Sequence, residues 1–220
     1  MSKKSQNTVE TFDEERTVGR PKSSEKRLQI LKSASDLFLS HGYKLTSMDA
    51  VAKSSGVSKQ TVYSHFANKD SLFNAVIELK CITYQIDSSN LNLSAAPLPD
   101  ILEEIGIRFL HLFTDPDIID MYTLIIGESR SNAHVSKLFY EAGPERSLQL
   151  VTDIIYTHPD VALAQMSAKE AAADFFNLLE FDFHMKSILH LPYNMPPSKF
   201  KAHARKTAHK LMSIIQHASH

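Results

Sequence analysis

Residues 46–66, TSMDAVAKSSGVSKQTVYSHF, predict two short helices in immediate succession. Thr46 is a residue type that caps helix N-termini, and the run Ser54-Ser55-Gly56 supplies a glycine where the first helix has to stop. Ser58 then caps the second helix. The side chains around this second helix that are expected to be buried are Val57, Val62 and Phe66. Two short helices joined by a tight turn with a glycine are typical of a helix-turn-helix.

The second helix leaves polar side chains on its outer face, as a DNA-reading helix does. In a helix-turn-helix this helix lies in the major groove. Gln60 can pair with adenine, Lys59 can meet guanine or phosphate, and the Thr61 methyl group can touch thymine. An ordinary helical hairpin in a polar domain is the alternative. The side chains expected to meet bases or phosphates are Thr46, Ser58, Lys59, Gln60, Thr61, Tyr63, His65 and Lys69.

The rest of the chain has the apolar spacing of amphipathic helices. Proline or glycine separates the helical segments after residue 100, and no window alternates long enough to predict a strand. The predicted fold is all-α with about nine helices. We expect a flexible arm over residues 1–19, a three-helix helix-turn-helix domain over 20–70, and a larger helical effector-binding and dimerisation domain over 71–220.

The charges are divided unevenly between these parts. Residues 20–70 hold nine Lys and Arg against four Asp and Glu, whereas residues 71–220 hold twelve against seventeen. A basic block followed by an acidic body indicates that one end of the molecule meets a polyanion.

One cysteine, Cys81, rules out a disulfide within the chain, and no run approaches the ~18–20 apolar residues that cross a membrane. We expect a cytoplasmic protein without a membrane partner.

Two stretches resemble a known family. Residues 20–73, with FLSHGY, TSMDAVAKSSGVS and TVYSHFANKDSLF at matching spacing, resemble the DNA-binding domain of the tetracycline-repressor (TetR) family. Residues 121–151, MYTLIIGESRSNAHVSKLFYEAGPERSLQLV, are similar to the C-terminal domain of its AefR-like subgroup. The resemblance implies a homodimer on a partly palindromic operator of double-stranded DNA. It also implies repression that a small-molecule effector releases, and it carries over the same DNA contacts.

The residues before the first helix offer one more DNA contact. Arg20 stands in a Gly-Arg-Pro unit that is narrow enough to enter the minor groove, where its charge would meet negative potential. A plain linker explains the unit equally well.

The last two helical segments, about 167–190 and 197–218, have apolar faces too wide for one contact. A two-fold bundle of two helices from each subunit would bury them. The expected dimer interface consists of Phe175, Leu178, Phe200, Ala204, Ala208, Leu211 and Ile215.

A ligand pocket is expected among the helices of residues 100–190, and a hydrophobic or amphipathic effector would suit it. Ordinary core is the alternative for each of the candidates. The candidate pocket residues are Phe109, Phe113, Tyr122, Ile125, Ile126, Phe176, Leu179, Phe183 and His184. A ligand there could move the helix at about 69–87, which links both domains.

Other functions find less support in the sequence. Glu180 and His184 lie four residues apart on one helix face, but no compact metal-binding pattern and no nucleophile motif surround them. We therefore predict no enzyme, no catalytic residue, no metal and no cofactor. The remaining alternative is a broadly acting or architectural DNA-binding protein, or an activator, without a small-molecule inducer.

Overall fold

The computed structural model describes residues 22–86, 96–159, 161, 163 and 165–217, and this part of the chain is helical without strands. This confirms the all-α prediction. There are ten helices in the described ranges, one more than expected. They are α1 (Lys22–Leu45), α2 (Met48–Ser55), α3 (Lys59–His65), α4 (Lys69–Thr83), α5 (Leu98–Phe113), α6 (Pro116–Glu128), α7 (Ala133–Ala142), α8 (Pro144–Thr157), α9 (Ala168–Ile188) and α10 (Pro197–His217).

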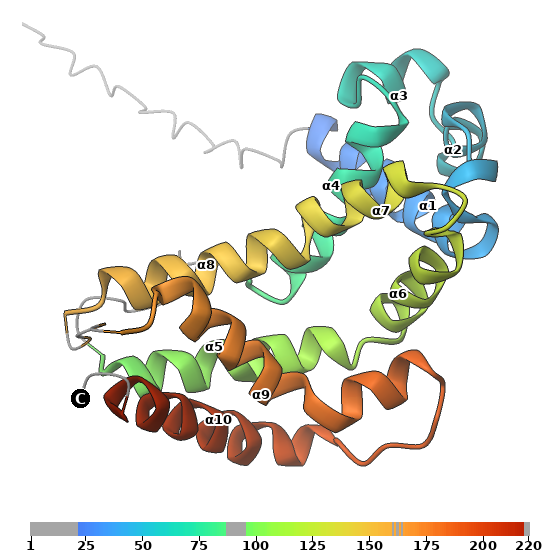
Figure 1. Ribbon diagram of the computed structural model, residues 1–220. Helices are drawn as coiled ribbons and strands as arrows, with labels where there is room; N and C mark the ends of the chain where they lie inside the picture. The colour runs from blue at the N-terminus through green and yellow to red at the C-terminus, as the bar shows by residue number, and fades with distance from the viewer. Residues whose placement is uncertain (1–21, 87–95, 160, 162, 164, 218–220) are drawn as a thin grey trace, which may run out of the picture.

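The first three helices form one end of the molecule (Figure 1). Their core is aromatic: the ring of Phe73 on α4 meets Phe38 at 5.1 Å and Tyr43 at 5.3 Å between centroids, both edge to face. Val62 and Phe66 are buried as predicted, and Val57 is half-buried. Edge-to-face pairs of this kind add to the energy of burial, so α4 is held firmly against α1.

Gly42 bends α1 near its C-terminal end. Its φ of 76° lies in the left-handed region, which glycine adopts without strain. A side chain there would also collide with the carboxylate of Glu128 on α6. The backbone leaves the helical region at Gly42, and a short further turn follows the bend as far as Leu45.

The apolar core of the first helices continues into the body. Met121, Ile125, Val135 and Phe139, from α6 and α7, are buried in the same cluster as Ile30 and Val51 of the N-terminal helices. A second cluster joins α5, α8, α9 and α10, and α10 lies along α5 (Figure 1). Gly106 of α5 allows this approach, because a Cβ there would be 3.0 Å from the Ala204 Cβ of α10.

None of the helices in the described ranges is both long enough and apolar enough to cross a membrane.

Candidate DNA interface and effector pocket

Three local caps set the angle between α2 and α3. Ser47 begins α2, its hydroxyl accepting a hydrogen bond from the Ala50 amide at 3.1 Å. Gly56 ends it with φ 66° and ψ 22°, a left-handed conformation that suits glycine. Ser58 accepts from the Thr61 amide at 3.1 Å and begins α3. The predicted turn is therefore present, with a serine hydroxyl capping the start of each helix and the Gly56 amide closing the end of α2.

The outer face of α3 is polar and open to solvent. Lys59, Gln60 and Tyr63 are exposed, and Thr61 and His65 are half-buried. Lys59 pairs with Asp49 of α2 at 2.8 Å, which raises the pKa of its ammonium. Both partners of this pair are exposed, and such surface pairs contribute little stability. Lys59 can therefore exchange Asp49 for a phosphate or a base edge at small cost.

Two predicted DNA contacts have other partners in the structure. Thr46 is buried, and its hydroxyl donates to the carbonyls of Leu37 and Gly42 at 3.0 and 2.8 Å. The structure also corrects the N-cap of α2, which is Ser47 and not Thr46. The Thr46 side chain is consequently not available for a phosphate.

Lys69 is used inside the domain in a similar way. Its ammonium donates to the carbonyls of Tyr43 and Thr46 at 2.8 and 2.9 Å and lies over the Tyr43 ring. It neutralises the carbonyl end of α1, where the helix dipole is negative. The expectation of a free cation beside DNA is corrected for this side chain. Arg20 lies outside the described residues.

We expect Lys69→Met to change stability more than DNA recognition. The substitution keeps the alkyl stem but leaves the α1 carbonyls without a charged donor, which should cost about 1.5–3 kcal/mol. Urea unfolding measures that cost. In the DNA titration, the slope of log affinity against log salt concentration should stay unchanged for Lys69→Met. For Lys59→Met the slope should fall by about one, as expected when one phosphate contact is lost. A reduced salt slope for Lys69→Met would instead place Lys69 on a phosphate.

The start of α4 also ties the N-terminal helices to the body. Asp70 accepts a hydrogen bond from the Tyr43 hydroxyl of α1 and contacts His134 Nε2 of α7 at 2.8 Å. The Tyr43 hydrogen bond is the main reason that the pKa of Asp70 lies below its usual value. Asp70 thus joins one helix of the DNA-reading end to one helix of the body, and it does so as an anion.

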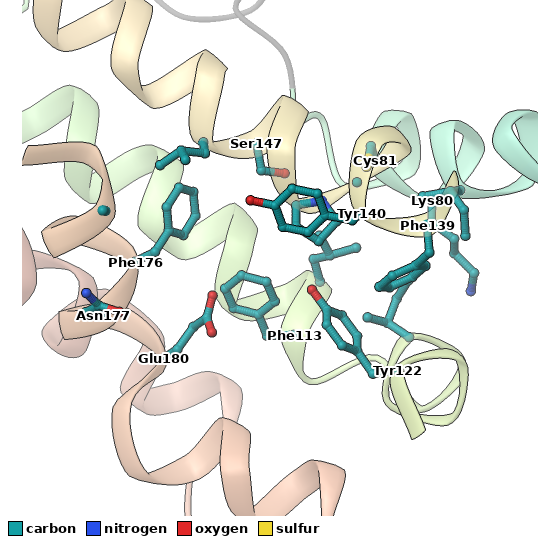
Figure 2. A pocket seen from close by; sticks show the side chains of 17 residues that line it. Lys80, Cys81, Phe113, Tyr122, Phe139, Tyr140, Ser147, Phe176, Asn177 and Glu180 are labelled. Atoms are coloured by element: carbon teal, nitrogen blue, oxygen red, sulfur yellow. The ribbon is translucent and has the colours of Figure 1, made fainter. Parts of the chain in front are cut away.

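A cavity of about 350 Å³ lies inside the body. Residues of α4, α5, α6, α7, α8 and α9 line it, one side is open to solvent, and Figure 2 shows the lining side chains. Most of the wall is apolar or aromatic. The lining aromatic residues are Phe113, Tyr122, Phe139, Tyr140 and Phe176. A volume of this size matches a small organic ligand.

The polar groups of the cavity differ in their partners. Lys80 of α4 is ion-paired to Asp115 and Asp117 at 3.2 and 2.7 Å. Glu180 of α9 points into the cavity (Figure 2), and burial raises its pKa to about 7. Its Oε2 lies 3.8 Å from His184 Nε2, which is beyond hydrogen-bonding distance. The cavity therefore has one carboxyl group poised between its charged and neutral forms.

Comparison with known proteins settles the family. Residues 30–76 match the bacterial regulatory proteins of the tetR family, and residues 100–213 match the AefR-like transcriptional repressor C-terminal domain. The second match alone covers more than half of the chain. The chain belongs to the TetR family. Its α1 to α3 form the family's helix-turn-helix end, and the AefR-like match runs from the first turn of α5 to the last turns of α10.

Similar curated and solved proteins are also transcriptional regulators. The HTH-type transcriptional activator FasR of Mycolicibacterium smegmatis is 38% identical over 78 residues, which are 33% of this chain and 36% of FasR. The chain thus matches about a third of the length of that relative. A TetR-family structure from Mesorhizobium loti has 25% identity and a TM-score of 0.69, covering 89% of this chain and 98% of its own. The Flavonoid-responsive Regulator FrrA has 26% identity and a TM-score of 0.66, with 89% and 97% covered.

The structure separates the nine predicted pocket residues of this TetR-family chain into groups. Phe113, Tyr122 and Phe176 line the cavity. His184 lies behind the wall, its ring 5.2 Å from both Phe113 and Tyr122, with Nδ1 buried and unbonded in the described structure. Ile126 is exposed on α6. The prediction is corrected for four residues that are buried but absent from the lining: Phe109, Ile125, Leu179 and Phe183.

Sequence reasoning missed several wall residues. Glu180 was considered only as a metal ligand, and within the described residues no group of three or more potential metal ligands occurs. Its four-residue spacing to His184 was the available signal. The other missed lining residues with polar atoms are Lys80, Cys81, Tyr140, Ser147 and Asn177.

The predicted dimer residues lie mostly inside the subunit. Six of them are at most 3% exposed within a single chain, so they have no surface to offer a second copy. Their apolar stripe on α10 packs against α5 and α9 of the same subunit. Leu178 alone of the seven is half-buried. The six corrected residues are Phe175, Phe200, Ala204, Ala208, Leu211 and Ile215.

Proposed function

We propose that this protein is a sequence-specific transcriptional regulator that binds a partly palindromic operator as a homodimer and leaves it when a small ligand fills the cavity. The observation that carries the proposal is the polar, solvent-exposed face of α3 on a helix whose opposite side is anchored by Val62. Membership in the TetR family supports DNA binding, and the AefR-like match supports repression. Such a protein acts beside DNA in the bacterial cytoplasm and needs no catalytic group.

The exposed side of α9 and α10 is our proposed dimer surface. A depression between the two helices is lined by Asn177 and Leu178 of α9 and by Lys206 and Lys210 of α10. Asp174 precedes Leu178 by one helical turn on the same face. Around a two-fold axis, α9 of one subunit can lie beside α10 of the other, which would set this acid against the two lysines.

The cavity and the DNA-reading end share α4, which supports regulation by a ligand. Ile77, Lys80 and Cys81 of α4 line the cavity, and Asp70 at the start of the same helix contacts α1 and α7. A ligand that favours one position of α4 would change the separation of the two α3 helices in the dimer. Coupling of this kind is typically ~1–3 kcal/mol, or ~5–150-fold in affinity.

Selection of bound sites from random duplex DNA at physiological salt tests the proposed function. We expect a two-fold-related motif with half-sites about one helical turn (~34 Å) apart. Repeating the selection with Gln60→Ala should relax base preference at one position of each half-site, at a cost of about 1–3 kcal/mol on the original site. Lys59→Met is the comparison, because loss of a lysine on a phosphate weakens all sites alike, whereas loss of a lysine on a base edge relaxes one position.

Two outcomes would contradict the proposal. Salt-sensitive binding with no enriched motif would favour an architectural protein, and equal loss on every sequence would remove Gln60 from base reading.

A further inference from the structure

The cavity has an unbalanced charge. Among the residues that the structure describes, Lys80 is the only lysine in the wall and is neutralised by Asp115 and Asp117, and no arginine lines the wall. Arg146 belongs to the neighbouring surface and pairs with Glu78. In the described part of the chain, no protein donor hydrogen-bonds to the Glu180 carboxyl group. A ligand in the cavity can therefore meet the carboxyl group of Glu180, whereas the Lys80 ammonium is already paired.

The surroundings of Glu180 are aromatic. Figure 2 shows its carboxyl group pointing from α9 into the space beside Phe113 and Phe176, with Tyr122 on the far side of Phe113. Aromatic faces attract cations within about 6 Å of the ring centre, and the attraction grows when water is excluded. An anionic ligand would bring a second negative charge next to Glu180, where the low dielectric strengthens repulsion.

We propose that the effector is a lipophilic cation, an ammonium group on an apolar aromatic or aliphatic body, whose nitrogen lies against Glu180. This rests on the proposed function of the cavity as the effector site and names the class of ligand it takes. The aromatic walls receive the body by burial, and the carboxylate fixes its orientation. A fatty acid or another carboxylate of equal size is the ligand that this cavity rejects.

The same arrangement links binding to pH. Burial raises the pKa of Glu180 to about 7, and a bound cation lowers it again by favouring the ionised carboxylate. Binding therefore releases a proton, and affinity rises as the pH increases through about 7.

Other titratable side chains also lie around Glu180. Burial lowers the pKa of His184 on the same helix and raises that of Cys81 on α4 and Tyr122 on α6. The pKa of Lys80 is raised by Asp115 and Asp117 against an opposing effect of burial. Tyr140 of α7 also lines the cavity.

The test uses three probes with one biphenyl body. They are (4-phenylbenzyl)trimethylammonium, its uncharged carbon isostere with a neopentyl group, and 4-biphenylacetate. Calorimetric titration of the full chain should show the cation binding roughly tenfold or more tightly than the isostere, with the anion weakest. Between pH 6 and 8 the affinity for the cation should rise, whereas that for the isostere should stay constant.

Glu180→Gln is the decisive variant. It should lose roughly tenfold of the affinity for the cation and all of its pH dependence, with affinity for the isostere unchanged. Glu145→Gln, an exposed residue of α8, is the matched control and should behave as wild type. Thermal unfolding of both variants checks that the body is intact. Equal affinity for cation and isostere, or undiminished binding by Glu180→Gln, would overturn the proposal.

A parallel operator-release assay separates this inference from the function it rests on. A cation that binds through Glu180 without releasing the operator would uphold the ligand class and contradict regulation by this cavity. If 4-biphenylacetate releases the operator, and does so equally well from Glu180→Gln, regulation by a ligand would be upheld and the cationic ligand class would be contradicted.

Discussion

Reversing the charge of Lys206 and Lys210 is expected to turn the dimer into a monomer and to weaken operator binding by ~10²–10⁴-fold. Both side chains line the depression between α9 and α10 and are exposed in the single subunit. Lys206→Glu with Lys210→Glu would set two acids against Asp174 of the second copy. A monomer holds one half-site, so it loses the effective concentration that the paired subunit supplies.

Sedimentation and DNA titration measure the two parts of this effect. Lys199→Glu with Lys201→Glu changes the net charge equally. Both residues lie near the start of α10, outside the depression, so this variant should leave the dimer intact. If the Lys206 and Lys210 variant sediments as a dimer, the contact between subunits lies on another face. If it is monomeric and still binds the operator fully, recognition does not require two subunits.

Phe73→Ala should remove most of the stability of the DNA-reading end. The ring is completely buried and touches Phe38 and Tyr43 edge to face. Truncating such a side chain costs about 3–5 kcal/mol, which is a large part of the ~5–15 kcal/mol that holds a typical domain together. Operator binding should fall with the folded fraction.

Urea unfolding followed by circular dichroism gives the measurement for Phe73→Ala. Phe73→Leu, which refills most of the space, should lose much less, and Ile82→Ala, at an exposed position on the same helix, should change stability by less than about 0.5 kcal/mol. A loss below about 1 kcal/mol for Phe73→Ala would mean that α1 and α4 close around the missing ring.

The helix-turn-helix could be read from the sequence because its signals are local. Gly56 and Ser58 act on backbone amides within a few residues of themselves, and the structure places them as predicted. Lys69 was misjudged for the opposite reason, because it meets the Tyr43 carbonyl 26 residues away along the chain, and no local pattern reveals that contact. Thr46 was taken for a helix cap, whereas its hydroxyl donates to the Gly42 carbonyl four residues back and to the Leu37 carbonyl nine residues back.

The body shows the limit of periodicity. The apolar stripe of α10 was recognised, but a stripe does not say which surface covers it. Gly106 lets α10 approach α5 closely, so the stripe is used within the subunit and is not free for a second copy. Glu180 was overlooked as a ligand group because a glutamate in a helix is usually solvated. Only the fold places α4 and α6 across from it.

The apolar cluster that runs from Ile30 to Phe139 has a consequence for protein engineering. A chimeric sensor made by joining the first helices of one regulator to the body of another would cut through this cluster. Such a hybrid would need residues of α6 and α7 transplanted together with α1 to α4, including the glycine at position 42 and the carboxylate that packs on it. The natural unit of exchange in this molecule is therefore larger than the segment that touches DNA.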